Sequence, residues 1–286
     1  MYIVFLFSMQ EERMKRIMTL ALSAALVMAF AATAFAGATY DKIMKDKVVR
    51  IGIMTDSIPG AFYNAKKEWV GFDVDIANEI AKRMGVKIDQ VPVNNKTRIG
   101  FLQQGRIDMS VSNMTHKRSR DKSIDFSITY FFDGQKFLAP KGKFSTHKDF
   151  VGKRIAVMQG TTSELNVKKL LKEMGDAAPK VISYQKESEC FQALQMGRAD
   201  AWSTDSTILL GYAAQVPGKY ELVGDFFSNE PYGIGLVEDD SKLRDAVNFA
   251  LQDMWNDGTY ETIYAKWYGP DTKYYFPLTE KIEMWP

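Results

Sequence analysis

The chain has 286 residues, of which 46% are hydrophobic, so it can bury one large or two medium cores and is not an intrinsically disordered protein. Its formal net charge is +2. Residues 1–36 contain three basic and two acidic residues, so the rest of the chain has 34 basic and 33 acidic residues and a net charge of +1. This balance gives no electrostatic footprint for nucleic acid or an anionic membrane. One cysteine and two histidines predict no disulfide, no metal site and no cofactor.

Residues 14–36 predict an export signal. They begin with basic residues, continue with an apolar run and end in Ala-Phe-Ala, which is typical of a cleavable secretory signal peptide. We therefore expect the mature chain to start at Gly37 and to be secreted into the periplasm. Residues 1–13 precede a better start and are expected to be an upstream extension. A membrane anchor is the alternative, but the apolar stretch 17–32 is short for a span of about 20 residues.

Strand and helix patterns alternate from residue 47 onwards. Phe72, Ile76, Ile80 and Met84 recur at helical spacing and are followed by Gly85, so they predict a helix whose core face they form. The elements predicted in order are a strand at 47–54, a helix at 72–84, a strand at 87–93, a helix at 97–104 and a strand at 107–111. This βαβαβ order is typical of an α/β protein with a parallel sheet.

The same unit then returns. The motif Leu-Gln-x-Gly-Arg-x-Asp ends at Asp108 and again at Asp200, and Arg-Ile-x-x-Met begins at Arg50 and again at Arg154. These offsets are far longer than the roughly 20–50 residues of a solenoid repeat, so they predict two similar α/β lobes. The elements predicted for the second lobe are a strand at 154–157, a helix at 164–174, a strand at 180–184, a helix at 188–196 and a strand at 199–203.

The last part of the chain predicts a helix to about residue 214, strands at 220–223 and 232–237, and helices at 241–255 and 260–267. The repeat places Asn113 and Asp205 at equivalent strand ends. Because ligands of open α/β sheets sit beyond the carboxyl ends of the strands, these two residues are expected to face each other across a cleft. Asp108 and Asp200 are interpreted as structural hydrogen-bonding residues outside the site.

The stretch 105–127, GRIDMSVSNMTHKRSRDKSIDFS, predicts an anion site. A buried strand ends there in the polar residues Ser112, Asn113 and Thr115, and basic residues follow. Free backbone N–H groups and an arginine at such a place can converge on an anion. The stretch therefore indicates carboxylate binding.

The spacing Asn113-Met-Thr115, four residues, Arg120 and then Ile-Asp-Phe-Ser resembles the signature of periplasmic amino-acid-binding proteins of ABC importers, the bacterial extracellular solute-binding proteins of family 3. The stretch GTYETIYAKWYG resembles the carboxyl-terminal end of the same family. The resemblance spans residues 47–269.

This resemblance implies the two-lobed, type II periplasmic-binding-protein fold, with two similar α/β lobes joined by two crossover segments. The implied crossovers lie near residues 132–136 and 228–232. The implied boundaries are 37–134 plus 232–286 for lobe 1 and 135–231 for lobe 2.

A free amino acid offers a carboxylate, an ammonium group and a side chain, and burying all three requires partners for each. The resemblance assigns the carboxylate to Thr115, Arg120 and Thr162. It assigns the ammonium group to the Asn113 carbonyl and to Asp205. It assigns the ligand side chain to a third set, namely Met54, Ser57, Asn95, Arg98, Thr161 and Glu187. Thr161 and Thr162 are also candidates for a plain helix cap.

Segment 92–99 resembles glutamate/aspartate-binding members, in which an arginine at the position of Arg98 meets the acidic side chain. Those members carry a second arginine where this chain has Met54 and a histidine where it has Glu187. A buried Glu187 carboxylate would repel a glutamate side chain. The expected ligand is a polar or acidic L-amino acid.

The resemblance implies a monomeric binding protein, without catalytic residues, that closes on a free amino acid and delivers it to an ABC permease in the inner membrane. One alternative is a lyase on the same scaffold, similar to cyclohexadienyl dehydratase, with Glu187 as the acid and Arg98 holding an anionic substrate. Such an enzyme needs a positioned proton donor and acceptor, and only Glu187 is left unassigned. The other alternative is a sensory input protein with a separate signalling partner.

Overall fold

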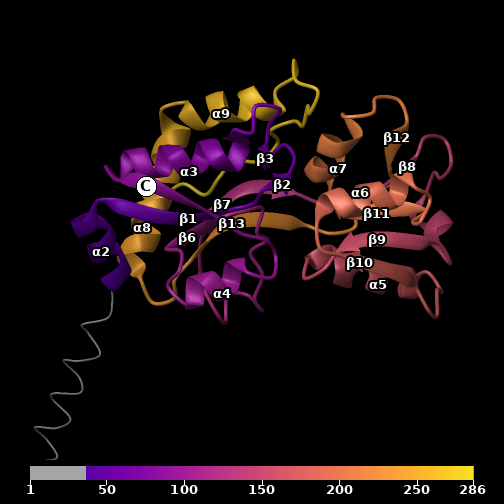
Figure 1. The fold of residues 1–286 in the computed structure, drawn as a ribbon, viewed down its shortest axis with the longest axis horizontal. Helices are drawn as coiled ribbons and strands as arrows, with labels where there is room; N and C mark the ends of the chain where they lie inside the picture. The colour runs from indigo at the N-terminus through magenta and orange to yellow at the C-terminus, as the bar shows by residue number, and fades with distance from the viewer. Residues whose placement is uncertain (1–36, 286) are drawn as a thin grey trace, which may run out of the picture.

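The computed structural model describes residues 37–285, so the predicted export signal lies outside the described residues. The chain forms two lobes, each built on a five-stranded sheet (Figure 1). The first sheet, which defines the first lobe, has the order β5 (Lys87–Pro92), β1 (Val48–Ile53), β6 (Met109–Val111), β13 (Glu230–Leu236), β7 (Asp125–Asp133). The second, which defines the second lobe, has the order β10 (Lys180–Tyr184), β9 (Arg154–Met158), β11 (Ala201–Asp205), β8 (Gln135–Pro140), β12 (Tyr220–Val223). The predicted two-lobed α/β fold is confirmed.

Each sheet is mixed, so the prediction of a parallel sheet holds for only part of it. Strands β5, β1 and β6 are parallel, whereas β13 pairs antiparallel with both β6 and β7. In the second sheet β10, β9 and β11 are parallel, and β8 runs antiparallel to β11 and β12. Parallel neighbours need a crossover connection, usually a helix. Here β7 of the first sheet passes straight into β8 of the second sheet, and the chain returns from β12 of the second sheet to β13 of the first. No helix lies within either connection, and β8 and β13 run antiparallel to their neighbours.

Helices cover the sheets of both lobes. Those of the first lobe are α2 (Ala38–Asp46), α3 (Phe72–Arg83), α4 (Arg98–Gln103), α8 (Ser241–Asn256) and α9 (Thr259–Tyr268). The second lobe has a 3-10 turn, η1 (His147–Phe150), and the helices α5 (Thr162–Glu173), α6 (Glu187–Gln195) and α7 (Ser206–Ala213). A small sheet of β2 (Asp56–Ser57), β3 (Ala61–Tyr63) and β4 (Trp69–Val70) links β1 to α3. Within residues 37–285, no helix is both long and apolar enough to cross a membrane.

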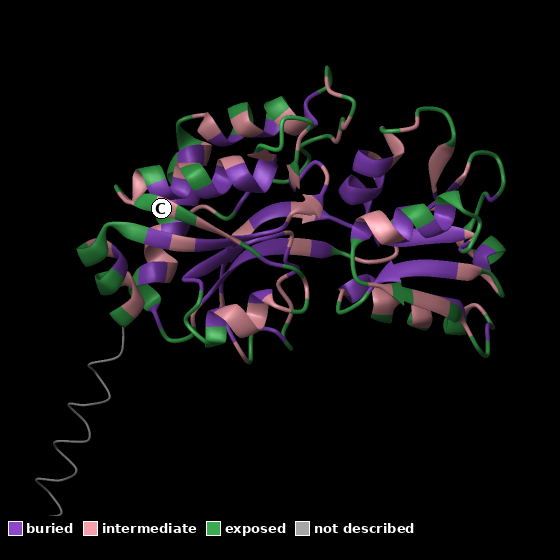
Figure 2. Ribbon diagram, viewed as in Figure 1, coloured by how far each residue is buried: buried purple, intermediate pink, exposed green. Residues whose placement is uncertain are grey.

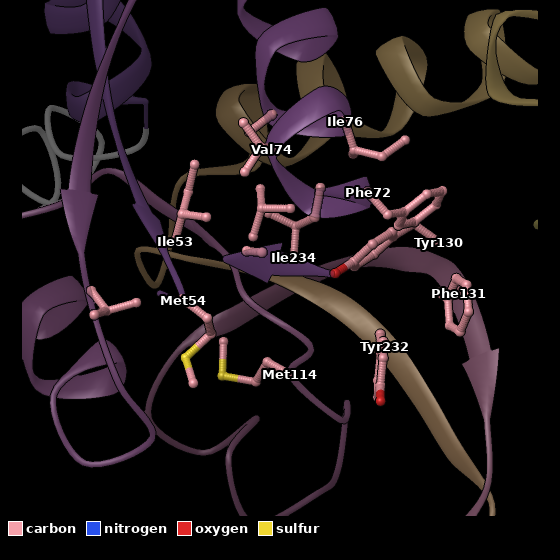
Figure 3. Close-up of a cluster of buried hydrophobic side chains, with 14 of the residues drawn as sticks. Ile53, Met54, Phe72, Val74, Ile76, Met114, Tyr130, Phe131, Tyr232 and Ile234 are labelled. Atoms are coloured by element: carbon pink, nitrogen blue, oxygen red, sulfur yellow. The ribbon is translucent and has the colours of Figure 1, made fainter. Parts of the chain in front are cut away.

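The sheets and the inner faces of the helices form the cores, while the outer helix faces are exposed (Figure 2). On α3 the predicted core residues Phe72, Ile76 and Ile80 are at most 1% exposed, and Met84, just beyond its end, is half-buried. Figure 3 shows Phe72 beside Tyr130, and their ring centroids are 6.3 Å apart. Burying an aromatic side chain contributes roughly 1.5–3 kcal/mol, so this cluster fixes α3 on the sheet beside the lobe crossovers.

The two lobes repeat one structural detail. The carboxylate Oδ2 of Asp108 accepts from the backbone N–H of Arg50 at 2.8 Å and from its Nε at 3.1 Å. In the second lobe Asp200 makes the same bonds with Arg154, at 2.9 and 3.1 Å. The hydrogen bonds from Arg154 lower the pKa of Asp200 to about 2. The structural interpretation of both aspartates is confirmed.

Candidate functional site

A pocket lies between the lobes and is lined by residues of both. All the predicted ligand-binding residues line it. The structure adds residues that the sequence reasoning left out of the site, namely Ser112, Thr204 and Ile208. Ser112 and Thr204 could have been found, because each directly precedes a predicted residue at a strand end.

The pocket sits where strands end and helices begin. Met54 follows β1, Asn113 follows β6, and Asp205 ends β11. Thr162 and Glu187 are the first residues of α5 and α6. The carboxyl ends of parallel strands and the amino ends of helices thus meet at one place, as expected for an open α/β sheet. Ser57, the last residue of β2, also lines this pocket and is 1% exposed.

Arg120 is the only buried member of the basic run that follows β6. It is 7% exposed and its Nη1 donates to the carbonyl oxygen of Thr115 at 2.8 Å. Burial lowers the pKa of Arg120 from its ordinary value. Arg118 is exposed and Lys117 is half-buried, so these two face solvent or the cleft rim. The loop therefore brings one guanidinium into the pocket.

Arg98, the first residue of α4, is a second buried guanidinium in the pocket. It is 3% exposed, and its Nη1 donates to the carbonyl oxygen of Ser112. Its Nε has no hydrogen-bond partner among the described residues. Burial and then the charge of Arg120 lower the pKa of Arg98 to about 9. This arginine therefore lacks an anionic partner within 4.0 Å among residues 37–285.

Asp205 supplies a carboxylate from the second lobe. It is 7% exposed, and it accepts from the Tyr232 hydroxyl at 2.6 Å and from Gln135 Nε2 at 3.2 Å. Burial, and then the charge of Glu230, raise the pKa of Asp205 well above its ordinary value. A cation placed beside this carboxylate would favour its charged form.

Asn113 has the left-handed backbone conformation, with φ of 48°, which asparagine tolerates better than most residues. Its backbone N–H donates to Asp73 Oδ2 at 3.0 Å, and the Tyr130 hydroxyl donates to Asp73 Oδ1 at 2.8 Å. Its carbonyl oxygen accepts from Arg98 at 3.5 Å. Asp73, on α3, thus holds the turn that presents the Asn113 carbonyl to the pocket.

Glu187 carries the only carboxyl group of the pocket besides Asp205. It is 2% exposed; its Oε1 accepts from Thr204 Oγ1 at 3.4 Å, and its Oε2 has no partner among residues 37–285. Burial and then the charge of Asp56 raise the pKa of Glu187 well above its ordinary value. This favours a neutral carboxyl group, which can donate a hydrogen bond.

Asn95 of the first lobe contacts the second lobe. Its Nδ2 donates to Sδ of Met158, at the end of β9, at 3.3 Å.

The threonines of the pocket are engaged by protein groups. Thr115 and Thr162 donate their hydroxyl protons to Glu230 Oε2, at 2.6 and 2.8 Å. Because a hydroxyl has only one proton to give, neither threonine donates its hydroxyl proton to a ligand in this arrangement. Thr161 accepts from the backbone N–H of Glu164 at 3.3 Å, so the helix-cap interpretation is confirmed for Thr161. Glu230 itself was not predicted, and no local pattern marks it.

The charges of the pocket are buried but not paired with one another. In the described part of the chain, neither Arg98 nor Arg120 forms a salt bridge within 4.0 Å with a carboxylate. Buried charges are costly unless they are paired. Two guanidinium groups and the Asp205 carboxylate therefore favour a ligand that carries charges of both signs. No group of three or more metal-ligating side chains occurs within residues 37–285.

Comparisons with known proteins agree with this chemistry. The profile of the bacterial extracellular solute-binding proteins, family 3, matches residues 49–270. The ABC transporter glutamine-binding protein GlnH of Bacillus subtilis is 37% identical over 232 residues, covering 79% of this chain and 82% of that protein. The glutamate/aspartate import solute-binding protein of Escherichia coli is 32% identical over 264 residues, covering 88% and 86%.

A solved structure has the same fold. The crystal structure of an ancestral amino-acid-binding protein, described as a precursor of cyclohexadienyl dehydratase, superposes with a TM-score of 0.74 at 35% identity. The match covers 80% of this chain and 99% of that one. The two sequence relatives carry names of transport binding proteins rather than of enzymes.

Proposed function

We propose, from the premise that this chain belongs to the bacterial extracellular solute-binding proteins of family 3, that it is the amino-acid-binding component of an ABC importer. The observation that carries this proposal is the set of buried, mutually unpaired charges between the lobes. Arg120 comes from the first lobe and Asp205 from the second. A zwitterion supplies the counter-charge that each one lacks.

In this proposal the ligand carboxylate lies against Arg120, whose planar guanidinium suits a bidentate contact. Thr115 and Thr162 contribute their backbone N–H groups, since their hydroxyl protons point to Glu230. The ammonium group lies between the Asp205 carboxylate and the Asn113 carbonyl. Each end of the ligand then contacts groups that the pocket leaves without a counter-ion.

The ligand side chain reaches the remaining residues of the pocket, Met54, Ser57, Asn95, Arg98, Thr161 and Glu187. A neutral Glu187 removes the repulsion that a carboxylate would exert on an acidic ligand, because it donates a hydrogen bond instead of carrying charge. Arg98 donates from the same end of the pocket. Both groups favour a side chain that ends in oxygen, as in glutamine or glutamate, and the names of the two relatives support this choice.

The proposal includes how the protein works in transport. Strand β13 of the first sheet begins at Glu230, so the second lobe boundary lies two residues before the implied one. Lobe 1 then comprises residues 37–134 plus 230–286, lobe 2 comprises 135–229, and the lobes close on the amino acid. The mature chain starts at Gly37, is exported to the periplasm as a monomer and hands its ligand to an inner-membrane permease. The family description as extracellular solute-binding proteins supports the export.

A thermal-shift screen of the purified mature protein tests the proposal. The probes are the twenty amino acids and acids of the shikimate pathway. A ligand that binds only the folded state at 100 times its dissociation constant adds about 2.7 kcal/mol of stability, which is easily detected. We expect glutamine or glutamate to give the largest shift, and the absence of a shift with every amino acid would contradict the proposal.

The same screen addresses a lyase on this scaffold. The fold match to a precursor of cyclohexadienyl dehydratase and the unpartnered Glu187 carboxyl favour this second candidate. A cyclohexadienyl acid would stabilise an enzyme against unfolding, and the enzyme would then convert the acid to product. A transport receptor instead releases its amino acid unchanged. Product analysis after prolonged incubation separates the two, and we expect no conversion.

A further inference from the structure

Glu230 is a buried carboxylate beside the pocket but outside it. It begins β13 in the first lobe, it is 1% exposed, and it is not among the residues that line the ligand pocket. Its strand partner is Asp133, at the point where β7 leaves the first sheet. It lines a second, open hollow of about 970 Å³ next to the pocket, and Thr115 and Thr162 line both. Thr115 and Thr162 therefore separate Glu230 from the ligand pocket.

The Glu230 carboxylate accepts four side-chain hydrogen bonds. Its Oε2 accepts from Thr115 at 2.6 Å and from Thr162 at 2.8 Å. Its Oε1 accepts from Ser228 Oγ at 2.8 Å and from Asn166 Nδ2 at 3.1 Å. No lysine or arginine of residues 37–285 lies within 4.0 Å of this carboxylate. The donors within hydrogen-bonding distance of this carboxylate are therefore all neutral.

Two of these four bonds cross between the lobes. Thr115 forms a β-bridge with Tyr232, so it moves together with β13 and Glu230. Thr162 and Asn166 lie on α5, which packs on β9, β10 and β11 of the second lobe (Figure 1). Separating the lobes would break the bonds from Thr162 and Asn166 and keep the bond from Thr115. Full satisfaction of this buried carboxylate thus requires closed lobes.

We propose that Glu230 is an interlobe clasp, a positioning residue that favours closure and fixes the Thr162 hydroxyl without touching the ligand. This inference rests on the proposed lobe closure. Each hydrogen bond across the lobes stabilises the closed state whether or not an amino acid is present. The clasp therefore raises the fraction of the protein that is in the closed, binding-competent state. Apparent affinity rises in proportion to that fraction, for every ligand alike.

The first experiment measures closure without any ligand. Spin labels at Lys96→Cys in the first lobe and Lys172→Cys in the second, both exposed positions, report the interlobe distance. We expect Glu230→Gln and Asn166→Ala each to shift the distance distribution toward longer values. Glu173→Gln, which removes a carboxylate from the exposed side of α5, is the matched control and should leave it unchanged. Unchanged distances in both clasp variants, with folding verified by circular dichroism, would overturn the proposal.

The second experiment measures dissociation of glutamine and glutamate by stopped-flow fluorescence. The clasp predicts that Glu230→Gln speeds dissociation of both by the same factor, about tenfold. The double variant with Asn166→Ala should add little, because the two residues share one contact. If Glu230→Gln changes the dissociation rates of glutamine and glutamate by different factors, Glu230 contacts the ligand directly and the clasp is wrong. If the wild type binds neither amino acid, the proposed function fails, while the ligand-free distances still decide the clasp.

Discussion

At the scale of single residues, the two pocket arginines have different surroundings. Arg120 bonds within its own loop, to Thr115, whereas Arg98 lies at the start of α4 and its Nε has no hydrogen-bond partner in the described part of the chain. In the proposed function the first serves the carboxylate common to all amino acids. The second serves the part of the ligand that varies.

We therefore expect Arg98→Ala to change the ranking of ligands, with glutamate losing more affinity than glutamine. Arg120→Ala should weaken all of them, because truncating one member of a buried charge pair costs about 2–5 kcal/mol, roughly 30-fold to several thousand-fold. Isothermal titration calorimetry with both amino acids measures this. Equal losses for every ligand in both variants would show that Arg98 does not serve the side-chain end.

Asp73 should give the protein a pH-dependent stability. Burial raises its pKa from 3.8 to about 6, so between these values the folded protein binds this proton more tightly than the unfolded chain. The free energy of unfolding should fall as pH rises through this window, by about 3 kcal/mol, and then level off. Asp73→Asn removes the titration.

The measurement for Asp73 is urea unfolding of wild type and Asp73→Asn between pH 4 and 7. The difference in unfolding free energy between the two proteins isolates this carboxyl, because other groups titrate in both. We expect the difference to change with pH below about 6 and to be constant above it. A difference that is constant over the whole range would show that Asp73 keeps an ordinary pKa.

The residues that could be predicted are those with a repeated or spaced pattern. Arg120 follows Thr115 at a fixed offset, and Asp205 is the repeat partner of Asn113. Glu230 and Tyr232 could not be predicted, because their roles depend on partners 68 and 27 residues away along the chain. No local pattern reports such contacts.

At the scale of elements, α7 of the second lobe lies directly against the first lobe. The Tyr212 hydroxyl donates to the carbonyl oxygen of Asp56 at 2.7 Å. One residue earlier, a Cβ added at Gly211 would lie 2.0 Å from the carbonyl oxygen of Ile58. Backbone cannot yield to such an overlap without moving. The glycine is therefore needed for close approach of the lobes.

Gly211→Ala should separate folding from closure. Alanine is more favourable than glycine inside a helix by about 1 kcal/mol, so the second lobe should not lose stability. In the closed arrangement the added methyl group meets the Ile58 backbone, so affinity for the amino acid should fall by about tenfold or more. Thermal melting without ligand and calorimetric titration with glutamine measure the two effects.

Gly100→Ala on α4 is the matched control for this glycine. A Cβ there would meet only the end of the Gln104 side chain, at 3.8 Å, and no atom of the second lobe within 4 Å. We expect it to bind as the wild type does. Unaltered binding by Gly211→Ala as well would mean that the lobes need not approach this closely.

The elements with clear helical or strand patterns could be predicted, whereas two long strands of the five-stranded sheets and the three short strands of the small sheet could not. Both β10 and β12 match their predicted ranges, whereas β7 and β8 were absent from the prediction. Most positions of β7 are buried, so it lacks the alternation of a half-exposed strand. It also runs into β8 through Gly134 alone, without a turn pattern to separate them. The helix α2 was missed too, next to the expected cleavage point.

At the scale of the whole molecule, the lobes meet at separate places around the pocket. Asp56 Oδ2 accepts from the backbone N–H of Glu187 at 3.1 Å, at the start of a helix whose own N-cap side chain makes no hydrogen bond. A carboxylate at a helix amino end is favoured by the helix dipole. Tyr232 reaches Asp205 in the middle of the interface. These contacts surround the pocket, so closure and ligand binding use neighbouring groups.

The crossover itself is held firmly on the second-lobe side. The Asp133 carboxylate accepts from the backbone N–H groups of Ser206 and Thr207, at 3.2 and 3.1 Å, and from both hydroxyls at 2.6 Å. The end of β7 is thus tied to the start of α7. If the lobes close as proposed, this anchor favours rotation of whole lobes over local rearrangement of the crossover.

If the two ends of the ligand are shared between the lobes, closure should follow occupancy. Asp205→Ala should weaken amino-acid binding by roughly 30-fold to several thousand-fold, since it removes the buried carboxylate that meets the ammonium group. At equal ligand concentration the variant should also be more open on average, because a ligand shifts a conformational equilibrium only through contacts that differ between the states. Small-angle scattering with and without saturating glutamine measures the radius of gyration.

Tyr232→Phe is the control that separates charge from closure. It removes the 2.6 Å bond to Asp205 but keeps the carboxylate, so its loss of affinity should be much smaller than that of Asp205→Ala. Equal losses would mean that Asp205 acts through the interlobe bond and not through the ligand. A wild type whose radius of gyration is unchanged at saturation, together with an Asp205→Ala variant that binds as tightly, would exclude closure around a shared zwitterion.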